Sequence, residues 1–95
     1  YTVKIGKFPF TASGKATAIS ETNGFVKVII DEKYGEILGV HMIGPDVTEL
    51  IGEATLARSV DATGKALFKT IHAHPTLSEA LMEATAMAYN EAVNI

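Results

Sequence analysis

Four residues that could take part in chemistry lie within one stretch of eight, His72 to Glu79. The imidazoles of His72 and His74 can move a proton near neutral pH, and Pro75 restrains the backbone beside His74. Two histidines at i and i+2 could also lie on one side of an extended segment and bind zinc, but zinc needs at least a third ligand. His41 is the only other histidine. We therefore expect no metal site.

Glu79 has two alternative roles in this stretch. The segment from Thr76 to Glu79 fits a capping box, in which the carboxylate returns to the backbone N–H of the cap residue. Alternatively, Glu79 bonds to one ring nitrogen of His74, fixes its tautomer and makes the other nitrogen a stronger, better oriented base. Spacing alone favours the cap. Ser78 shows no strained turn or oxyanion hole around it, so we interpret it as an ordinary serine at a helix start.

The composition limits the class of protein. With 95 residues the chain can form one domain, residues 1–95, and is too short for a multidomain enzyme. The net charge is −3 and the eight Lys and Arg residues form no run, so nucleic acid is not expected as a partner. No stretch is long and apolar enough to span a bilayer, and none is typical of a signal peptide. We expect a cytoplasmic protein, or one of the mitochondrial matrix if it is eukaryotic.

Two absences restrict the chemistry further. The chain contains no cysteine, which excludes disulfides, thiolate metal ligands and a cysteine nucleophile within it. No glycine-rich dinucleotide or P-loop motif occurs among its eight glycines, so the chain does not hold a nucleotide cofactor alone. Because the first residue is Tyr1, we expect a piece of a longer protein.

The apolar pattern predicts an α+β fold, an antiparallel β-sheet of three to five strands covered by helices largely from the C-terminal half. The order of the strands does not follow from the sequence. Alternating and β-branched residues predict the strands, the first of them at an edge, and i, i+3, i+4 spacing predicts the helices. The expected strands are 2–10, 25–31 and 36–43, and the expected helices are 46–60, 64–69 and 76–90. Residues 11–14 are expected to form a turn or an irregular link, and 15–21 either a strand or a short helix.

Local signals predict how these elements begin and turn. Residues 32–35 end in a glycine and predict a hairpin between the second and third strands. Asn23-Gly24 predicts a turn that pairs the preceding segment with this hairpin. Asp46 and Glu49 predict a capping box at the first long helix, and Thr63 is expected to cap the short one.

The last expected helix carries unusually small side chains on one face. Alanine recurs there every four residues, at positions 80, 84, 88 and 92. Small side chains allow another backbone to come close, so this face could pack against a helix or a partner subunit. A core helix of high helix propensity is the alternative, and both remain open.

Segments along the whole chain resemble the C-terminal interface domain of the pyridine-nucleotide disulfide oxidoreductases. The signature is His72-Ala73-His74-Pro75-Thr76-Leu77-Ser78-Glu79-Ala80, preceded in the family's order by the segments 3–10, 24–27 and 38–45. A His-Pro pair with a downstream glutamate is common to the family. The additional histidine, His72, makes the segment more similar to the family's dihydrolipoamide dehydrogenase branch than to glutathione reductase, which usually lacks it.

The resemblance implies a fold, a site and a partner. The fold would be the family's α+β dimerisation domain, which joins the subunits of a homodimer. His74 would be the catalytic acid-base residue, exchanging a proton with a dithiol substrate or the redox-active cysteine pair, and Glu79 would orient it. The bond before Pro75 would be cis, and His74 and Pro75 would lie near the FAD of the partner subunit.

The same resemblance implies what the chain lacks. The family's FAD- and NAD-binding domains and its cysteines are missing, so this would be an enzyme fragment that is inactive alone. The full enzyme would oxidise dihydrolipoamide to lipoamide through a cysteine disulfide, FAD and NAD. It would also dock onto the subunit-binding domain of the acyltransferase core of 2-oxoacid dehydrogenase complexes, through residues that cannot be assigned. Two alternatives stay open, the same domain of a glutathione reductase-like enzyme and a purely structural interaction domain.

Overall fold

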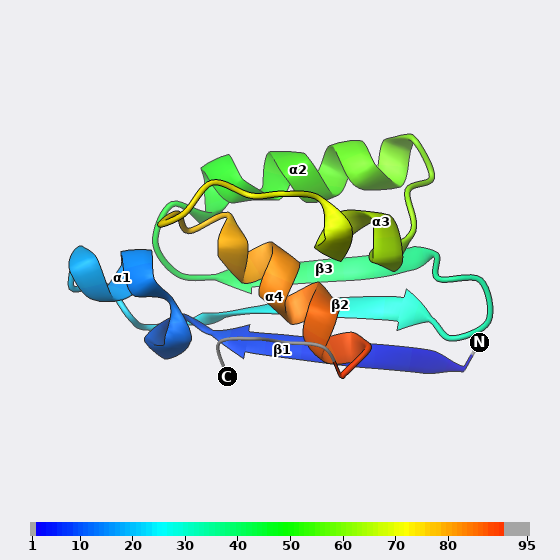
Figure 1. Cartoon of the computed structure of the whole chain (residues 1–95), viewed down its shortest axis with the longest axis horizontal. Coiled ribbons are helices and arrows are strands. Elements are labelled where there is room, and N and C mark those ends of the chain that lie inside the picture. The colour runs from blue at the N-terminus through cyan, green and yellow to red at the C-terminus, as the bar shows by residue number, and fades with distance from the viewer. Residues whose placement is uncertain (1, 91–95) are drawn as a thin grey trace.

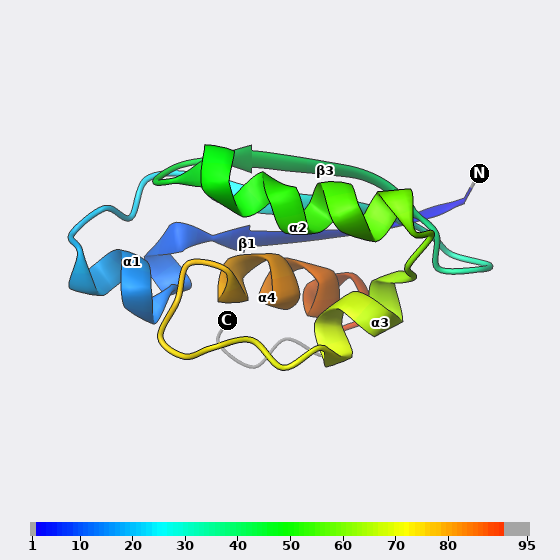
Figure 2. The same cartoon turned by 90° about the horizontal axis from the view of Figure 1, so that it is seen from above.

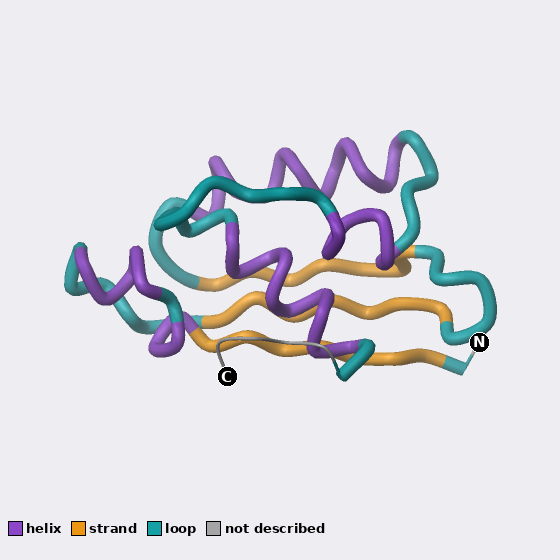
Figure 3. Tube along the Cα trace, viewed as in Figure 1, coloured by secondary structure: helices purple, strands orange, loops and turns teal. Residues whose placement is uncertain are grey.

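A three-stranded antiparallel sheet forms one layer of the molecule (Figures 1 and 3). The structure is a computed structural model that describes residues 2–90. The strands are β1 (Val3–Pro9), β2 (Phe25–Asp31) and β3 (Ile37–Ile43), in the spatial order β1-β2-β3. The prediction of an edge strand at the start of the chain is confirmed, and Pro9 ends that strand, where its missing N–H costs the sheet little.

Alternation along the strands sends one set of side chains into the core. Phe8, Val26 and Val28 are buried on the inner face, and Val26 lies opposite Phe8 in the register. Ile5 and Ile43 lie on the outer face and are exposed. This period of two is what the β-branched pattern predicted.

The β2–β3 connection is the expected hairpin. Gly35 adopts a positive φ of 78°, which a glycine accepts without a Cβ clash, and the Asp31 carboxylate accepts a hydrogen bond from the Tyr34 N–H at 2.9 Å.

The prediction of a turn at Asn23-Gly24 that pairs two strands is wrong. The preceding segment does not enter the sheet but forms a short 3-10 turn, η1 (Phe10–Ala12), and helix α1 (Gly14–Ala18). The short-helix alternative is therefore correct for residues 15–18, and the expected turn or link at 11–14 contains the end of η1 and the start of α1. Ser13 starts α1 by accepting a hydrogen bond from the Ala16 N–H at 3.1 Å.

The remaining helices cover one face of the sheet (Figure 2). They are α2 (Val47–Ser59), α3 (Gly64–Lys69) and α4 (Glu79–Ala88). Helix α2 packs on β3, α4 packs on β1 and β2, and α3 packs on α4. Within the described part of the chain, no helix has the length and apolar character needed to cross a membrane.

The two predicted helix caps differ in outcome. Thr63 caps α3 as expected, accepting from the Ala66 N–H at 3.2 Å. The capping box predicted at α2 is wrong, because Asp46 sits in the left-handed region with φ 54° and its side chain makes no capping bond. A cap residue needs extended backbone to aim its side chain at the first turn, and Asp46 does not have it.

The small face of α4 packs inside the domain rather than on a partner. Gly6 of β1 lies against the backbone of Ala84 and Ala88, so close that an added Cβ would overlap the Ala84 carbonyl oxygen. Ala80 and Ala84 are almost fully buried. The core-helix alternative is therefore correct for these positions, while Ala92 lies outside the described residues.

Candidate functional site

The candidate site lies in the segment between α3 and α4, which precedes the N-terminal end of α4 (Figure 1). Helix α4 begins at Glu79, three residues later than predicted, because the chain from Thr70 to Ser78 forms no regular helix. The His74–Pro75 peptide bond in this segment is cis. His74 and Pro75 are both exposed.

His74 and Glu79 are brought together as the sequence suggested. The Nδ1 atom of His74 lies 3.0 Å from each carboxylate oxygen of Glu79. Because a carboxylate only accepts hydrogen bonds, Nδ1 carries the proton, and in the neutral ring Nε2 then carries the lone pair. The His74 side chain is 74% exposed and that of Glu79 only 19%. Glu79 thus holds the His74 ring through Nδ1, while the ring itself remains largely exposed.

Glu79 also makes the backbone hydrogen bond that spacing alone favoured. Its Oε1 atom accepts from the Thr76 N–H at 2.9 Å, as the carboxylate of a capping box does, although Thr76 lies two residues before Ser78, the N-cap of α4. The Thr76 hydroxyl donates to the Ala73 carbonyl oxygen at 2.7 Å, whereas the hydroxyl of a capping box accepts a hydrogen bond from a backbone N–H of the helix. The two roles were posed as alternatives, but the carboxylate performs both.

A cavity of about 200 Å³ adjoins this pair. His74, Thr76 and Glu79 line it, together with Glu83, which is buried one turn further along α4. The segment around Ser13 lines it as well. The cavity is smaller than those that enclose a cofactor or a drug-sized ligand, about 300 to 1,000 Å³.

His72 does not share a side of the chain with His74. Its side chain is 7% exposed and turns inward, where Nε2 lies 2.6 Å from the Glu53 carboxylate of α2. Its Nδ1 lies 2.8 Å from the Thr70 carbonyl oxygen. Glu53 was not predicted from the sequence, although a carboxylate three residues after Leu50, beside the apolar stripe of the helix, was a usable signal. No group of three His, Asp or Glu side chains that could hold a metal occurs within residues 2–90.

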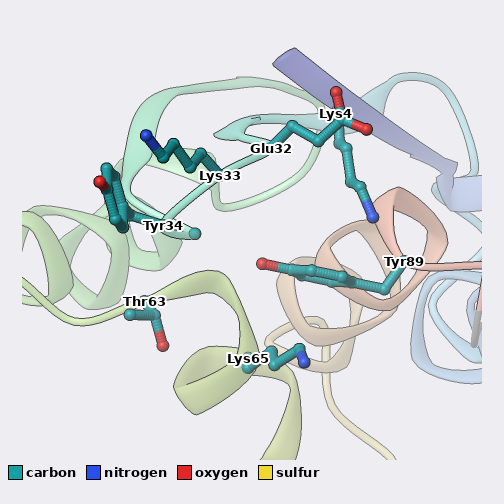
Figure 4. Close-up of a pocket in the computed structure, with 8 residues that line it drawn as sticks. Lys4, Glu32, Lys33, Tyr34, Thr63, Lys65 and Tyr89 are labelled. Carbon is teal, nitrogen blue, oxygen red and sulfur yellow. The ribbon is translucent and has the colours of Figure 1, made fainter. Parts of the chain in front are cut away.

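A second cavity, of about 280 Å³, lies at the other end of α4, around Tyr89 (Figure 4). The ammonium groups of Lys4 and Lys65 lie 5.1 and 6.0 Å from the centre of the Tyr89 ring. Burial raises the pKa of the Tyr89 phenol, and the negative charge of Asp31 raises it further. This phenol therefore stays protonated and is not a base at neutral pH.

The sequence matches a known family over residues 1–85, the pyridine nucleotide-disulphide oxidoreductase dimerisation domain. The chain belongs to this family. The match covers all three strands and the His74–Glu79 pair, so the resemblance seen in the sequence is confirmed.

Relatives of this dimerisation domain are named dihydrolipoyl dehydrogenase. The chain is 54% identical to the Bacillus subtilis protein over 94 residues, which are 99% of this chain and 20% of the relative. It is 54% identical to the Mycobacterium leprae protein over 83 residues, 87% of this chain and 18% of the relative. The chain thus spans about a fifth of the length of the curated relatives it matches.

Solved structures of flavoprotein disulfide reductases share the fold. LpdA from Mycobacterium tuberculosis aligns with a TM-score of 0.84 at 24% identity, over 90% of this chain and 19% of that one. An HOCl-induced flavoprotein disulfide reductase from Escherichia coli aligns with a TM-score of 0.86 at 24% identity, over 90% of this chain and 20% of that one. These likenesses confirm the predicted α+β fold.

Proposed function

We propose that this chain is the dimerisation domain of a dihydrolipoamide dehydrogenase and that it supplies His74 and Glu79 to the active site of the partner subunit. The observation that carries the proposal is the orientation of His74, whose Nδ1–H is held by the buried side of Glu79 while the rest of the ring is exposed. A base that acts in the active site of another subunit must be exposed on the surface of its own subunit. The identity of about one half to proteins named dihydrolipoyl dehydrogenase supports the choice of branch.

In this function His74 accepts a proton at Nε2 from a thiol of dihydrolipoamide. The thiolate so formed is the nucleophile that attacks a cysteine disulfide, breaking the S–S bond and releasing a cysteine thiolate. Glu79 stabilises the imidazolium through its bond to Nδ1, and the same proton can later be returned to a departing thiolate. The cysteine pair lies outside this chain, which contains no cysteine.

FAD and NAD would be bound by the FAD- and NAD-binding domains of the full protein, of which residues 1–95 would be the C-terminal domain. The described residues fit this division, because His74 and Pro75 are exposed and available to a flavin of the partner subunit. These cofactors supply the electron transfer from the reduced cysteine pair. The full enzyme would be a homodimer of the cytoplasm or mitochondrial matrix that docks onto the acyltransferase core of a 2-oxoacid dehydrogenase complex.

A His74→Gln variant of the full-length protein tests the proposal. General-base catalysis contributes about 10² to 10⁴ in rate, so dihydrolipoamide oxidation should fall by about 100-fold or more. FAD content and dimerisation should not change, because the His74 side chain is 74% exposed and contributes little to the core. His41→Gln is the matched control, as it removes an exposed imidazole from β3. Near-normal turnover of His74→Gln would rule out this role, and glutathione disulfide as the preferred substrate would rule out this branch.

A further inference from the structure

The segment that carries His74 is held by one inward-pointing side chain. From Lys69 to Pro75 every residue is exposed except His72, and Ile71 is 97% exposed. The nearest buried apolar anchors are Leu67 in α3 and Leu77 before α4. Hydrophobic burial therefore does not fix this segment between its ends, and its position depends on hydrogen bonds.

Both ring nitrogens of His72 face acceptors. Nδ1 lies 2.8 Å from a backbone carbonyl oxygen and Nε2 lies 2.6 Å from a Glu53 carboxylate oxygen. A carbonyl cannot donate, so Nδ1 carries a proton, and the short Nε2–Oε2 contact requires a second proton between those two atoms. The contact is thus a charge-assisted hydrogen bond, which is shorter and stronger than a neutral one. The His72 side chain is shielded from competing water at 7% exposure, while that of Glu53 is 32% exposed.

Glu53 is itself firmly placed. It lies in α2 beside Ala54, and Ala54 and Ala57 are buried in the core on the side of the helix that faces β3. The His72–Glu53 bond therefore fixes the segment relative to the sheet. His74 lies two residues after His72 in the same segment, so the position of the segment sets the distance from His74 to Glu79 and to any substrate.

We propose that Glu53 and His72 form a second carboxylate–histidine pair whose task is to position His74 for proton transfer. Glu53 and His72 are positioning residues, since neither side chain touches the reacting atoms. This inference rests on the proposed function, in which His74 is the base. A proton-transfer geometry that is wrong by about 1 Å can cost about 100-fold in rate, so loss of the tether acts on turnover rather than on binding.

The test uses Glu53→Ala, His72→Leu and the double variant in the full-length protein. Each single variant should lower kcat for dihydrolipoamide oxidation by about tenfold or more, with little change in KM. The double variant should be no slower than either single variant, because the two substitutions remove the same His72–Glu53 interaction. Reduction of an artificial dye by NADH, which needs no proton transfer at His74, should stay within about twofold of the parent.

Two further variants sharpen the comparison. Glu53→Gln should recover most of the lost kcat, because its amide can donate to Nε2 of a neutral His72 while Nδ1–H still bonds Thr70. Glu49→Ala removes an exposed carboxylate one turn earlier on α2 and should behave as the parent.

Unchanged kcat in Glu53→Ala, or a parallel fall of the thiol and dye reactions, would overturn the inference. The result for His74→Gln separates the two hypotheses. If His74→Gln is slow and Glu53→Ala is not, only the positioning role fails. If His74→Gln turns over normally, the proposed function fails.

Discussion

Gly6 is the position where a single added methyl group should disturb the whole domain. It lies in β1 opposite Val28 and faces the backbone of α4. A Cβ there would overlap the Ala84 carbonyl oxygen and lie 2.7 Å from the Ala88 nitrogen. Ordinary van der Waals contact begins at 3.4 Å, so the Ala88 nitrogen alone is 0.7 Å too close. Both obstacles are backbone atoms, which no rotamer change can move aside.

The expected cost is therefore at the upper end of the range for overpacking. Such insertions cost about 1 to 3 kcal/mol, and a clash with a helix backbone supports about 3 kcal/mol for Gly6→Ala. In a domain of this size each kcal/mol lowers Tm by about 4 to 8 °C, so Tm should fall by about 12 to 24 °C. Without the clash the sign would be opposite, because replacing glycine by alanine in a strand reduces the entropy of the unfolded chain.

Thermal and urea unfolding of the chain, followed by circular dichroism, measures this cost. Gly52→Ala is the matched control, since Gly52 lies in α2 and a Cβ there meets nothing within 4 Å. That variant should gain about 1 kcal/mol from helix propensity. If Gly6→Ala were as stable as the parent, the close contact between β1 and α4 would be incorrect.

Two smaller effects should also be measurable on the same chain. The pKa of Tyr89 is raised above its ordinary value of 10.0, so the unfolded chain loses this proton first as the pH rises, and the parent should lose more stability than Tyr89→Phe between about pH 9 and about pH 11. Equal losses in urea titrations would contradict the raised pKa of Tyr89. Thr63→Ala should cost about 1 kcal/mol through the lost cap of α3, while Thr63→Ser, which keeps the hydroxyl, should cost much less, and equal costs would contradict the cap.

The elements with a strong local pattern could be predicted from the sequence. The second strand, Phe25–Asp31, and the short helix, Gly64–Lys69, agree with the prediction at both ends. The first is a run of β-branched residues, and the second starts at a threonine whose cap needs only residues within one turn. In both cases the decisive interactions are local, so a short stretch of sequence contains all the residues that make them.

The wrong predictions share a different cause. Gly24 does adopt a positive φ of 107°, but the preceding segment forms a helix that is capped by Ser13, ten residues before Asn23, and does not join the sheet. Asp46 has the residue type of a cap but a left-handed backbone. Residue type signals a preference, and the surrounding chain decides whether the geometry can satisfy it.

Interactions between distant residues lay beyond any spacing argument. His72 and Glu53 are 19 residues apart, and their contact exists because α2 and the segment before α4 cover the same face of the sheet. The small face of α4 was likewise recognised, but its partner was a glycine in the first strand. Such contacts follow from the topology, which local sequence patterns did not predict.

The two roles of Glu79 were treated as alternatives because each was assigned the whole carboxylate. A carboxylate can accept about four hydrogen bonds, and the structure uses one oxygen for the Thr76 N–H and both for His74. The cap thereby becomes part of the site, since the bond to Thr76 holds the oxygen that orients the imidazole. Removing the Glu79 side chain would disturb the helix start and the base together. A variant that spares the cap must keep an oxygen facing Thr76, which Glu79→Gln can do only by turning its NH₂ group toward His74, where Nδ1–H needs an acceptor.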